Sequence, residues 1–264
     1  MWLRTICQLR FDIQVATPFV FMLRPRSGAQ QWVAREEYHL SQGIYPQEYT
    51  DGYGNLCQRL VASPGSFEVS TRAEVMTADT LDRAHGTPFT LIQDLPEQVL
   101  VYLLPSRYCE SDRFNALAMD IVAGLIPGYD QVAAIVDWVH QNIDYTPGSS
   151  VEPLSASEVR HNGHGVCRDL AHMGIALCRS LSIPARMVVG YRYALEPMDM
   201  HAWFEAYVGD RWYTFDPTQS SLEGGYVAVA YGRDAADVAL YTLFGPVVFA
   251  SMQYVDVELL RGRF

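Results

Sequence analysis

Cysteine is scarce in this sequence, and long apolar runs are missing from it. Five cysteines are present, an odd number at wide spacings, and no two of them form a CxxC pair. This usage is typical of a reduced, cytoplasmic chain rather than of a secreted disulfide framework. The N-terminus lacks the basic and apolar regions of a signal peptide, and no run of about 18 apolar residues could cross a bilayer. We therefore expect a cytoplasmic protein without a membrane partner.

Basic residues are outnumbered by acidic ones. The 19 Lys and Arg residues stand against 30 Asp and Glu, so the formal net charge is -11. This balance disfavours a nucleic-acid partner, which needs a basic footprint, and it says little about the substrate. The 264 residues are 49% hydrophobic and 12% aromatic, so the chain can fill a core and is not expected to be disordered.

The first part of the chain, residues 1–104, has the pattern of β-strands. Apolar and polar residues alternate over 9–15 and again over 67–75, and a Ser-Pro-Gly turn lies between them at 63–65. Short alternating strands at this spacing predict an antiparallel β-sandwich-like domain. No cluster of reactive side chains stands out in it, so we interpret it as a packing or recognition module.

The second part, residues 105–264, mixes helices and strands. Apolar residues recur with helical spacing in two segments, and a Ser-x-x-Glu capping box at 155–158 predicts a shorter helix. The two longer helices are expected at 130–143 and 166–181. Strands are expected at 185–191, 201–208, 211–215, 226–230 and 252–259. The whole chain is therefore predicted to have an α+β fold.

Cys167 stands where a loop enters the second long helix. The free N–H groups at a helix N-terminus carry a partial positive charge, which favours a thiolate over a thiol. Gly163 and Gly165 allow the backbone to turn tightly just before it. A lone cysteine is more often a buried structural residue than a nucleophile. A nucleophilic role for Cys167 therefore requires a base and an orienting group nearby.

His201 and Asp216 are placed by a predicted hairpin. A two-residue turn at 209–210, with Gly first as in type II′, pairs the two strands symmetrically. Counting outward puts Trp203 opposite Asp216 and makes His201 a diagonal neighbour of Asp216 on the same face. Such diagonal neighbours are roughly 7–8 Å apart at the backbone, within reach of an imidazole and a carboxylate. A bulge would break this register.

Three motifs together resemble the core of the transglutaminase-like superfamily. They are Gly-Val-Cys-Arg-Asp at 165–169, His-Ala-Trp-Phe-Glu at 201–205 and Trp-Tyr-Thr-Phe-Asp-Pro-Thr at 212–218, in the family's order of Cys, His and Asp. The resemblance is closest to a bacterial branch described as cysteine proteases, and the tail at 231–238 is also similar to this branch. The resemblance implies a β-rich N-terminal domain before a papain-like core, in which the helix that begins at Cys167 packs on an antiparallel sheet.

The resemblance also implies roles for the three residues. Cys167 would be the nucleophile, His201 the general base and acid, and Asp216 the acceptor that fixes the tautomer of His201. The thiolate would attack an amide carbonyl and form a thioester, with the backbone N–H of Cys167 as first oxyanion donor. We expect hydrolysis of peptides or proteins. Acyl transfer to amines by the same triad is the alternative, and a catalytically silent binding module is a third hypothesis.

Two further residues are candidates for substrate binding. Trp203 shares the face of His201, where it could wall the site or only pack on the sheet. His164 precedes the nucleophile, where it could line the site or restrict the substrate. His161, His164 and Cys167 have an H-x-x-H-x-x-C spacing, but no second cluster supplies further ligands, so we predict neither a metal nor a cofactor. Asp169 lies in the first helical turn, where a carboxylate is stabilising by itself, and we interpret it as structural.

Overall fold

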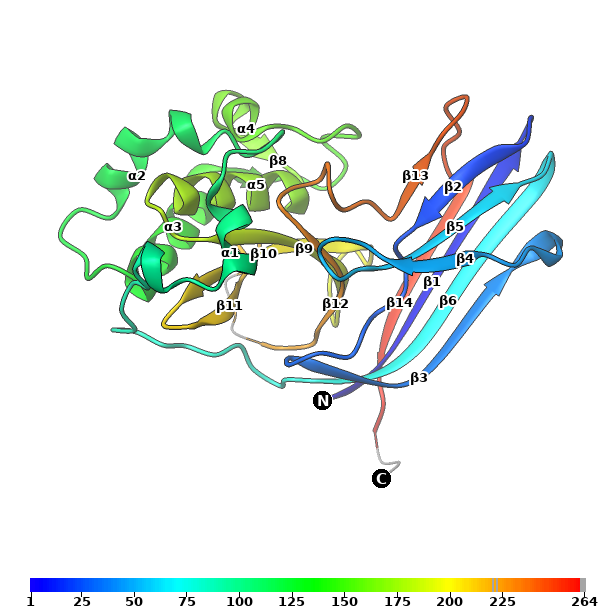
Figure 1. The fold of residues 1–264 in the computed structure, drawn as a ribbon, viewed down its shortest axis with the longest axis horizontal. Coiled ribbons are helices and arrows are strands. Elements are labelled where there is room, and N and C mark those ends of the chain that lie inside the picture. Colours follow the sequence, from blue (N-terminus) through cyan, green and yellow to red (C-terminus); the bar gives the residue numbers. More distant parts are fainter. Residues whose placement is uncertain (220, 222, 262–264) are drawn as a thin grey trace.

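The computed structural model describes residues 1–219, 221 and 223–261, and it has the α+β fold predicted from the sequence. Figure 1 shows two parts beside each other: a sandwich of long strands, and a core in which helices cover a smaller sheet. Within these described ranges, no helix is both long enough and apolar enough to span a bilayer.

The sandwich consists of two antiparallel sheets. Their strand orders are β14-β1-β6-β3 and β13-β2-β5-β4. Along β1 and β6, buried and more exposed side chains alternate, as expected for a sheet with one face in a core. The rings of Phe11, Phe19, Phe21 and Phe67 pack against one another between the sheets. The elements of this part are β1 (Trp2–Ile13), β2 (Thr17–Phe21), β3 (Gln31–Leu40), η1 (Ser41–Gly43), β4 (Gln47–Thr50), β5 (Leu56–Ala62), β6 (Gly65–Thr77), β13 (Tyr241–Leu243) and β14 (Met252–Leu259).

Two late strands complete the sandwich. β13 pairs with β2, and β14 pairs with β1 from Leu3↔Leu259 to Arg10↔Met252. The strand at 252–259 is present as predicted, but the division at residue 104 had assigned it to the catalytic part, whereas its partner is β1. Alternation identifies a strand and not its neighbour, so this pairing has no local signal. The division into 1–104 and 105–264 otherwise stays a prediction.

The core is built on an antiparallel sheet with the order β11-β10-β9-β12. Helix α5 packs on one face of this sheet, and α3 and α4 pack on α5. The strands are β9 (Ala185–Arg192), β10 (His201–Val208), β11 (Arg211–Phe215) and β12 (Tyr226–Gly232), and a short pair is formed by β7 (Asp144–Tyr145) and β8 (His164–Gly165). The helices are η2 (Ile92–Asp94), α1 (Glu97–Leu100), η3 (Val101–Leu103), η4 (Ser111–Arg113), α2 (Asn115–Ile121), α3 (Tyr129–Asn142), α4 (Ala156–Asn162) and α5 (Cys167–Ser180).

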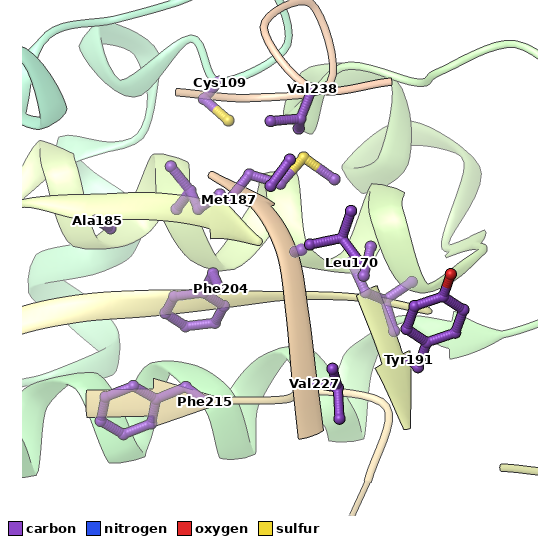
Figure 2. Packing of buried hydrophobic residues seen from close by; sticks show 14 of the residues in the cluster. Cys109, Leu170, Ala185, Met187, Tyr191, Phe204, Phe215, Val227 and Val238 are labelled. Atoms are coloured by element: carbon purple, nitrogen blue, oxygen red, sulfur yellow. The ribbon is translucent and has the colours of Figure 1, made fainter. Parts of the chain in front are cut away.

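Helix α5 approaches β10 closely because one of its positions has no side chain. Gly174 faces the ring of Phe204, and a Cβ at that position would lie 2.5 Å from Phe204 Cε1. Figure 2 shows Phe204 in the same packed cluster as Leu170 of the helix and Met187 of β9. The close approach fixes the height of the helix above the strand that carries His201.

The hairpin between β10 and β11 has the predicted register but a different turn. Val208 pairs with Arg211, which confirms the symmetric pairing. Gly209 and Asp210 both have positive φ, 53° and 65°, so the turn is type I′ and the predicted type II′ is wrong. Aspartate tolerates the left-handed conformation because its short side chain can bond locally, so a Gly-Asp pair is compatible with either turn.

Side chains of the sandwich complete the outer edge of β12. Gln31 Nε2 donates to the carbonyl of Ala228 at 2.8 Å, and Gln31 Oε1 accepts from the N–H of Ala228 at 2.7 Å. Asn55 bonds both backbone groups of Tyr231 in the same way, each at 2.7 Å. An edge strand would otherwise leave such groups unpaired. These bonds therefore fix the sandwich to the core.

Candidate active site

Cys167 is the first residue of α5. Its side chain is partly exposed, whereas those of the other four cysteines are buried. Burial raises the pKa of each of those four thiols, Cys7, Cys57, Cys109 and Cys178. Cys167 is therefore the thiol that a reagent in solution can reach most readily.

Asp169 fixes the start of this helix. Its carboxylate is buried and accepts from the N–H of Val166 at 3.2 Å, the N–H of Leu154 at 3.1 Å and Arg168 Nε at 3.1 Å. The hydroxyl of Ser150 donates to the same carboxylate. These bonds tie the loop before α4 to the first turn of α5, which agrees with the structural role inferred from the sequence.

The hairpin brings His201 and Asp216 together, because His201 begins β10 and Asp216 directly follows β11. His201 Nε2 lies 2.6 Å from Asp216 Oδ2, and both side chains are buried. Asp216 Oδ1 accepts from the N–H and the hydroxyl of Thr218, at 2.9 and 2.7 Å. His140 of α3 holds the next residue, with its Nδ1 3.0 Å from the carbonyl oxygen of Pro217. The carboxylate is therefore anchored on both sides.

The thiol of Cys167 is close enough to the His201 imidazole to affect its pKa. His201 Nδ1 is buried and makes no hydrogen bond of ordinary geometry within the described residues. Burial opposes a charged ring, but the charge and hydrogen bond of Asp216, followed by those of Cys167, outweigh it and raise the pKa of His201 to about 10. Burial also opposes ionisation of Asp216, yet His201 and Thr218 lower its pKa. These directions favour an imidazolium between a carboxylate and the sulfur.

Two residues behind Asp216 were missed by the sequence analysis. The hydroxyl of Tyr226 donates to Asp216 Oδ2 at 2.8 Å, and Arg192 Nε donates to the hydroxyl oxygen of Tyr226 at 3.2 Å. The two residues pair across β12 and β9. The sequence shows a strand at 226–230 but not that it joins β9, so no local signal could have identified them.

Trp203 lies beside the imidazole but has little exposed surface. Its ring stacks on His201, with the ring centroids 6.0 Å apart, and meets Tyr226 edge-on at 5.0 Å. The residue is 1% exposed and, with Tyr226 and Leu81, lines a cavity of about 240 Å³ between the sheet and the segment after β6. Trp203 supports the histidine, and contact with a substrate stays a prediction.

His164 lies on β8 and is exposed, with its Nδ1 3.1 Å from the carbonyl oxygen of Asn162. His161 is exposed as well. In the part of the chain that the structure describes, no group of three or more His, Cys, Asp or Glu side chains is arranged to hold a metal ion. A role of His164 toward the substrate remains a prediction.

Tyr145 is a third residue that the sequence analysis missed. Tyr145 of β7 pairs with Gly165 of β8, and Gly165 lies two residues before Cys167 in the chain. Burial, followed by the charges of Cys167 and Asp216, raises the pKa of Tyr145 to about 12. Its hydroxyl therefore stays protonated near neutral pH. A two-residue parallel strand pair is too short for the alternation that identifies strands.

Comparison with known proteins identifies the family of the chain. Residues 115–217, which include Cys167, His201 and Asp216, match the model of the transglutaminase-like superfamily. The crystal structure of a "Putative Cysteine Protease" from Cytophaga hutchinsonii superposes with a TM-score of 0.91, at 34% identity over 100% of this chain and 92% of that one. An uncharacterized protein of Mycobacterium leprae is 27% identical over 82% of each chain. The chain belongs to the transglutaminase-like superfamily.

Proposed function

We propose that this protein is a cysteine-dependent enzyme that hydrolyses amide bonds of peptides or proteins. The observation that carries the proposal is a set of three side chains: a reachable thiol at a helix N-terminus, a buried imidazole and a buried carboxylate 2.6 Å from Nε2 of that imidazole. The likeness to a protein described as a cysteine protease supports the same reaction class. Cys167, His201 and Asp216 are the proposed nucleophile, acid–base residue and orienting residue.

The proposed reaction has two halves. The Cys167 thiolate attacks the carbonyl carbon, and the His201 imidazolium gives its Nδ1 proton to the departing amine as the C–N bond breaks. Water then attacks the thioester, His201 takes the proton of that water, and the C–S bond breaks to release the acid. Asp216 stays ionised throughout and holds the ring through Nε2–H. The N–H of Cys167 has no acceptor within the helix and is the proposed first oxyanion donor.

The rate at which Cys167 reacts with iodoacetamide tests the proposed ion pair without knowledge of the substrate. At pH 7 we expect alkylation of wild-type Cys167 to be about tenfold or more faster than in His201→Gln, because the imidazolium stabilises the thiolate. Intact-mass spectrometry follows the reaction, and the four buried cysteines contribute little. His164→Gln, which alters an exposed histidine, is the matched control and should react like the wild type. Equal rates in wild type and His201→Gln would refute the proposal.

Acyl transfer to amines is the second candidate, since the same thioester could react with an amine in place of water. The chain suits a clean test because it contains no lysine, and its N-terminal amine is bonded to the Thr77 carbonyl and Asp79. A glutamine peptide is incubated with dansylcadaverine and the enzyme. Labelled peptide would establish transfer, and glutamate peptide or cleaved peptide without label would establish hydrolysis. A catalytically silent binding module would give neither product and no acyl adduct on Cys167.

The proposed place of action is the cytoplasm. All five cysteines are thiols and four of them are buried, which suits a reducing compartment. A peptide or protein substrate is proposed, with no nucleic-acid, membrane or cofactor partner.

A further inference from the structure

Two donors share one oxygen of Asp216. Oδ2 accepts from His201 at 2.6 Å and from the hydroxyl of Tyr226 at 2.8 Å, while Oδ1 is occupied by the two bonds from Thr218. Tyr226 is 7% exposed. Thr218 therefore anchors the carboxylate, and Tyr226 competes with the imidazole for the charge on the remaining oxygen.

Arg192 makes Tyr226 a stronger donor. Its Nε donates to the Tyr226 oxygen at 3.2 Å, and the guanidinium lies 5.5 Å from the centre of the Tyr226 ring. Arg192 is 4% exposed. A cation that donates to a hydroxyl oxygen polarises the O–H bond, and chains of hydrogen bonds strengthen one another in a low dielectric. Burial and the charge of Asp216 raise the pKa of Tyr226, against the effect of Arg192, so the hydroxyl keeps its proton.

Titratable groups from several elements interact with the His201–Asp216 pair. Cys167 of α5 acts on His201, and the charge of Asp216 acts on Tyr145 of β7 and Tyr226 of β12, while Arg192 of β9 acts on Tyr226. Of these, Tyr226 donates a hydrogen bond to the Asp216 oxygen that holds His201. The imidazole needs two opposed properties in the proposed reaction. It must be basic enough to take the thiol proton and acidic enough to return a proton to the departing amine.

We propose that Tyr226, backed by Arg192, is a positioning residue that sets how strongly Asp216 binds the Nε2–H of His201. By taking part of the charge on Oδ2, it keeps Asp216 from holding the imidazolium too firmly to release its other proton. The inference rests on the proposed function, because only a histidine that takes and returns a proton needs such a balance. Tyr226 acts through Asp216 and does not touch the reacting atoms.

The low-field proton resonance of the His201 Nε2–H bond tests this inference directly. The signal is assigned by its absence from His201→Gln and Asp216→Asn. In Tyr226→Phe, which keeps the ring that packs on Trp203 and His201, we expect the signal to move further downfield, because Oδ2 then serves one donor. Alkylation of Cys167 at pH 7 should stay within about twofold of the wild type, since the ion pair persists.

The control is Tyr191→Phe, which removes a buried hydroxyl on β9 that donates to the Leu23 carbonyl at 3.3 Å and not to Asp216. It should leave the resonance unmoved, and thermal unfolding shows that both variants fold. A resonance in Tyr226→Phe that stays at the wild-type position, moves upfield or disappears would overturn the inference. A different result would show that the proposed function fails: iodoacetamide would alkylate Cys167 no faster in the wild type than in His201→Gln.

Discussion

Asp169 shows how a single buried carboxylate can fix the start of a helix. It accepts from two backbone N–H groups and from Arg168 while being fully buried. Asp169→Asn keeps the size of the side chain but removes the charge and one acceptor. We expect it to lower the free energy of unfolding by roughly 2–4 kcal/mol, the range for losing one partner of a buried charged network.

Urea unfolding at pH 7 measures this change. Asp120→Asn, at an exposed position on α2, is the control and should stay within about 0.5 kcal/mol of the wild type. A loss for Asp169→Asn as small as that of the control would show that the carboxylate is not needed at the helix start.

The His201–Asp216 pair gives stability a definite pH dependence. The pKa of His201 is raised to about 10 in the folded protein, above about 6.5 in an unfolded chain. Its contribution is therefore complete below about pH 6.5 and is lost as the pH rises toward 10. The pKa of Asp216 is lowered, so its contribution is present above about pH 3.9 and is lost as the pH falls below that value.

Unfolding free energies of the wild type and of His201→Gln, measured between pH 6 and 10, check the upper window. We expect the two curves to converge as the pH rises, because only the wild type loses the ion pair. Curves that run parallel would mean that His201 is not charged in the folded protein. His164→Gln should follow the wild type throughout.

A helix start pointed to Cys167, and a hairpin register paired His201 with Asp216, but only the family resemblance placed that pair beside the helix. The roles of the three residues stay predictions. Neither the residue pattern nor the resemblance pointed to Tyr226 and Arg192. Those two meet across β9 and β12, and the partner of a strand is decided by packing that alternation does not encode. The residues that lie behind the proposed triad are therefore harder to predict than the residues proposed to perform the chemistry.

At the scale of elements, the spacing between α5 and β10 controls the distance from thiol to imidazole. Gly174→Ala would place a Cβ 2.5 Å from the ring of Phe204, so helix or ring must move. We expect a net loss of about 1–2 kcal/mol, since overpacking outweighs the better helix propensity of alanine. Alkylation of Cys167 should slow as α5 is pushed away from His201.

Thermal unfolding and the alkylation assay measure both effects in the same sample. Gly52→Ala is the matched control, because a Cβ at that position has open space and the residue has no positive φ. Wild-type reactivity in Gly174→Ala, together with the expected loss of stability, would show that the site tolerates a displaced helix.

Elements were predictable where a local pattern defines them. The strands 201–208 and 211–215 and the capping box at Ser155 were found as predicted, because alternation and capping are properties of consecutive residues. The turn type was not predicted correctly, because aspartate at the second position of a Gly-Asp turn can adopt either sign of φ.

At the scale of the molecule, Gln31 is the clearest tie between sandwich and core. It is 7% exposed and bonds both backbone groups of Ala228. Gln31→Ala leaves those groups without their partner, and we expect a loss of about 2–3 kcal/mol in urea unfolding. The neighbouring exposed Gln30→Ala is the control. An unchanged urea midpoint of unfolding would mean that water replaces the Gln31 amide without loss of stability.

Which strands belong to the sandwich was the feature of the fold that the sequence predicted least well. Residues 1–104 were predicted to form it, yet β13 and β14 supply one strand to each sheet. Long-range pairing is decided by which apolar faces find each other during folding, and nothing within a strand records the distance to its neighbour.

The pairing of β1 with β14 has a consequence for how the protein is made. Translation produces β1 well before its partner at Met252–Leu259, because the other strands and the helices of the described chain lie between them. Until then β1 has β6 on one side and a row of unsatisfied backbone groups on the other, which is the surface that chaperones protect and aggregates exploit. A polypeptide that stops before residue 252 would contain Cys167, His201 and Asp216 but would leave this edge of β1 open. Pairing with β14 therefore closes a sheet edge that stays exposed while the segments between the two strands are synthesised.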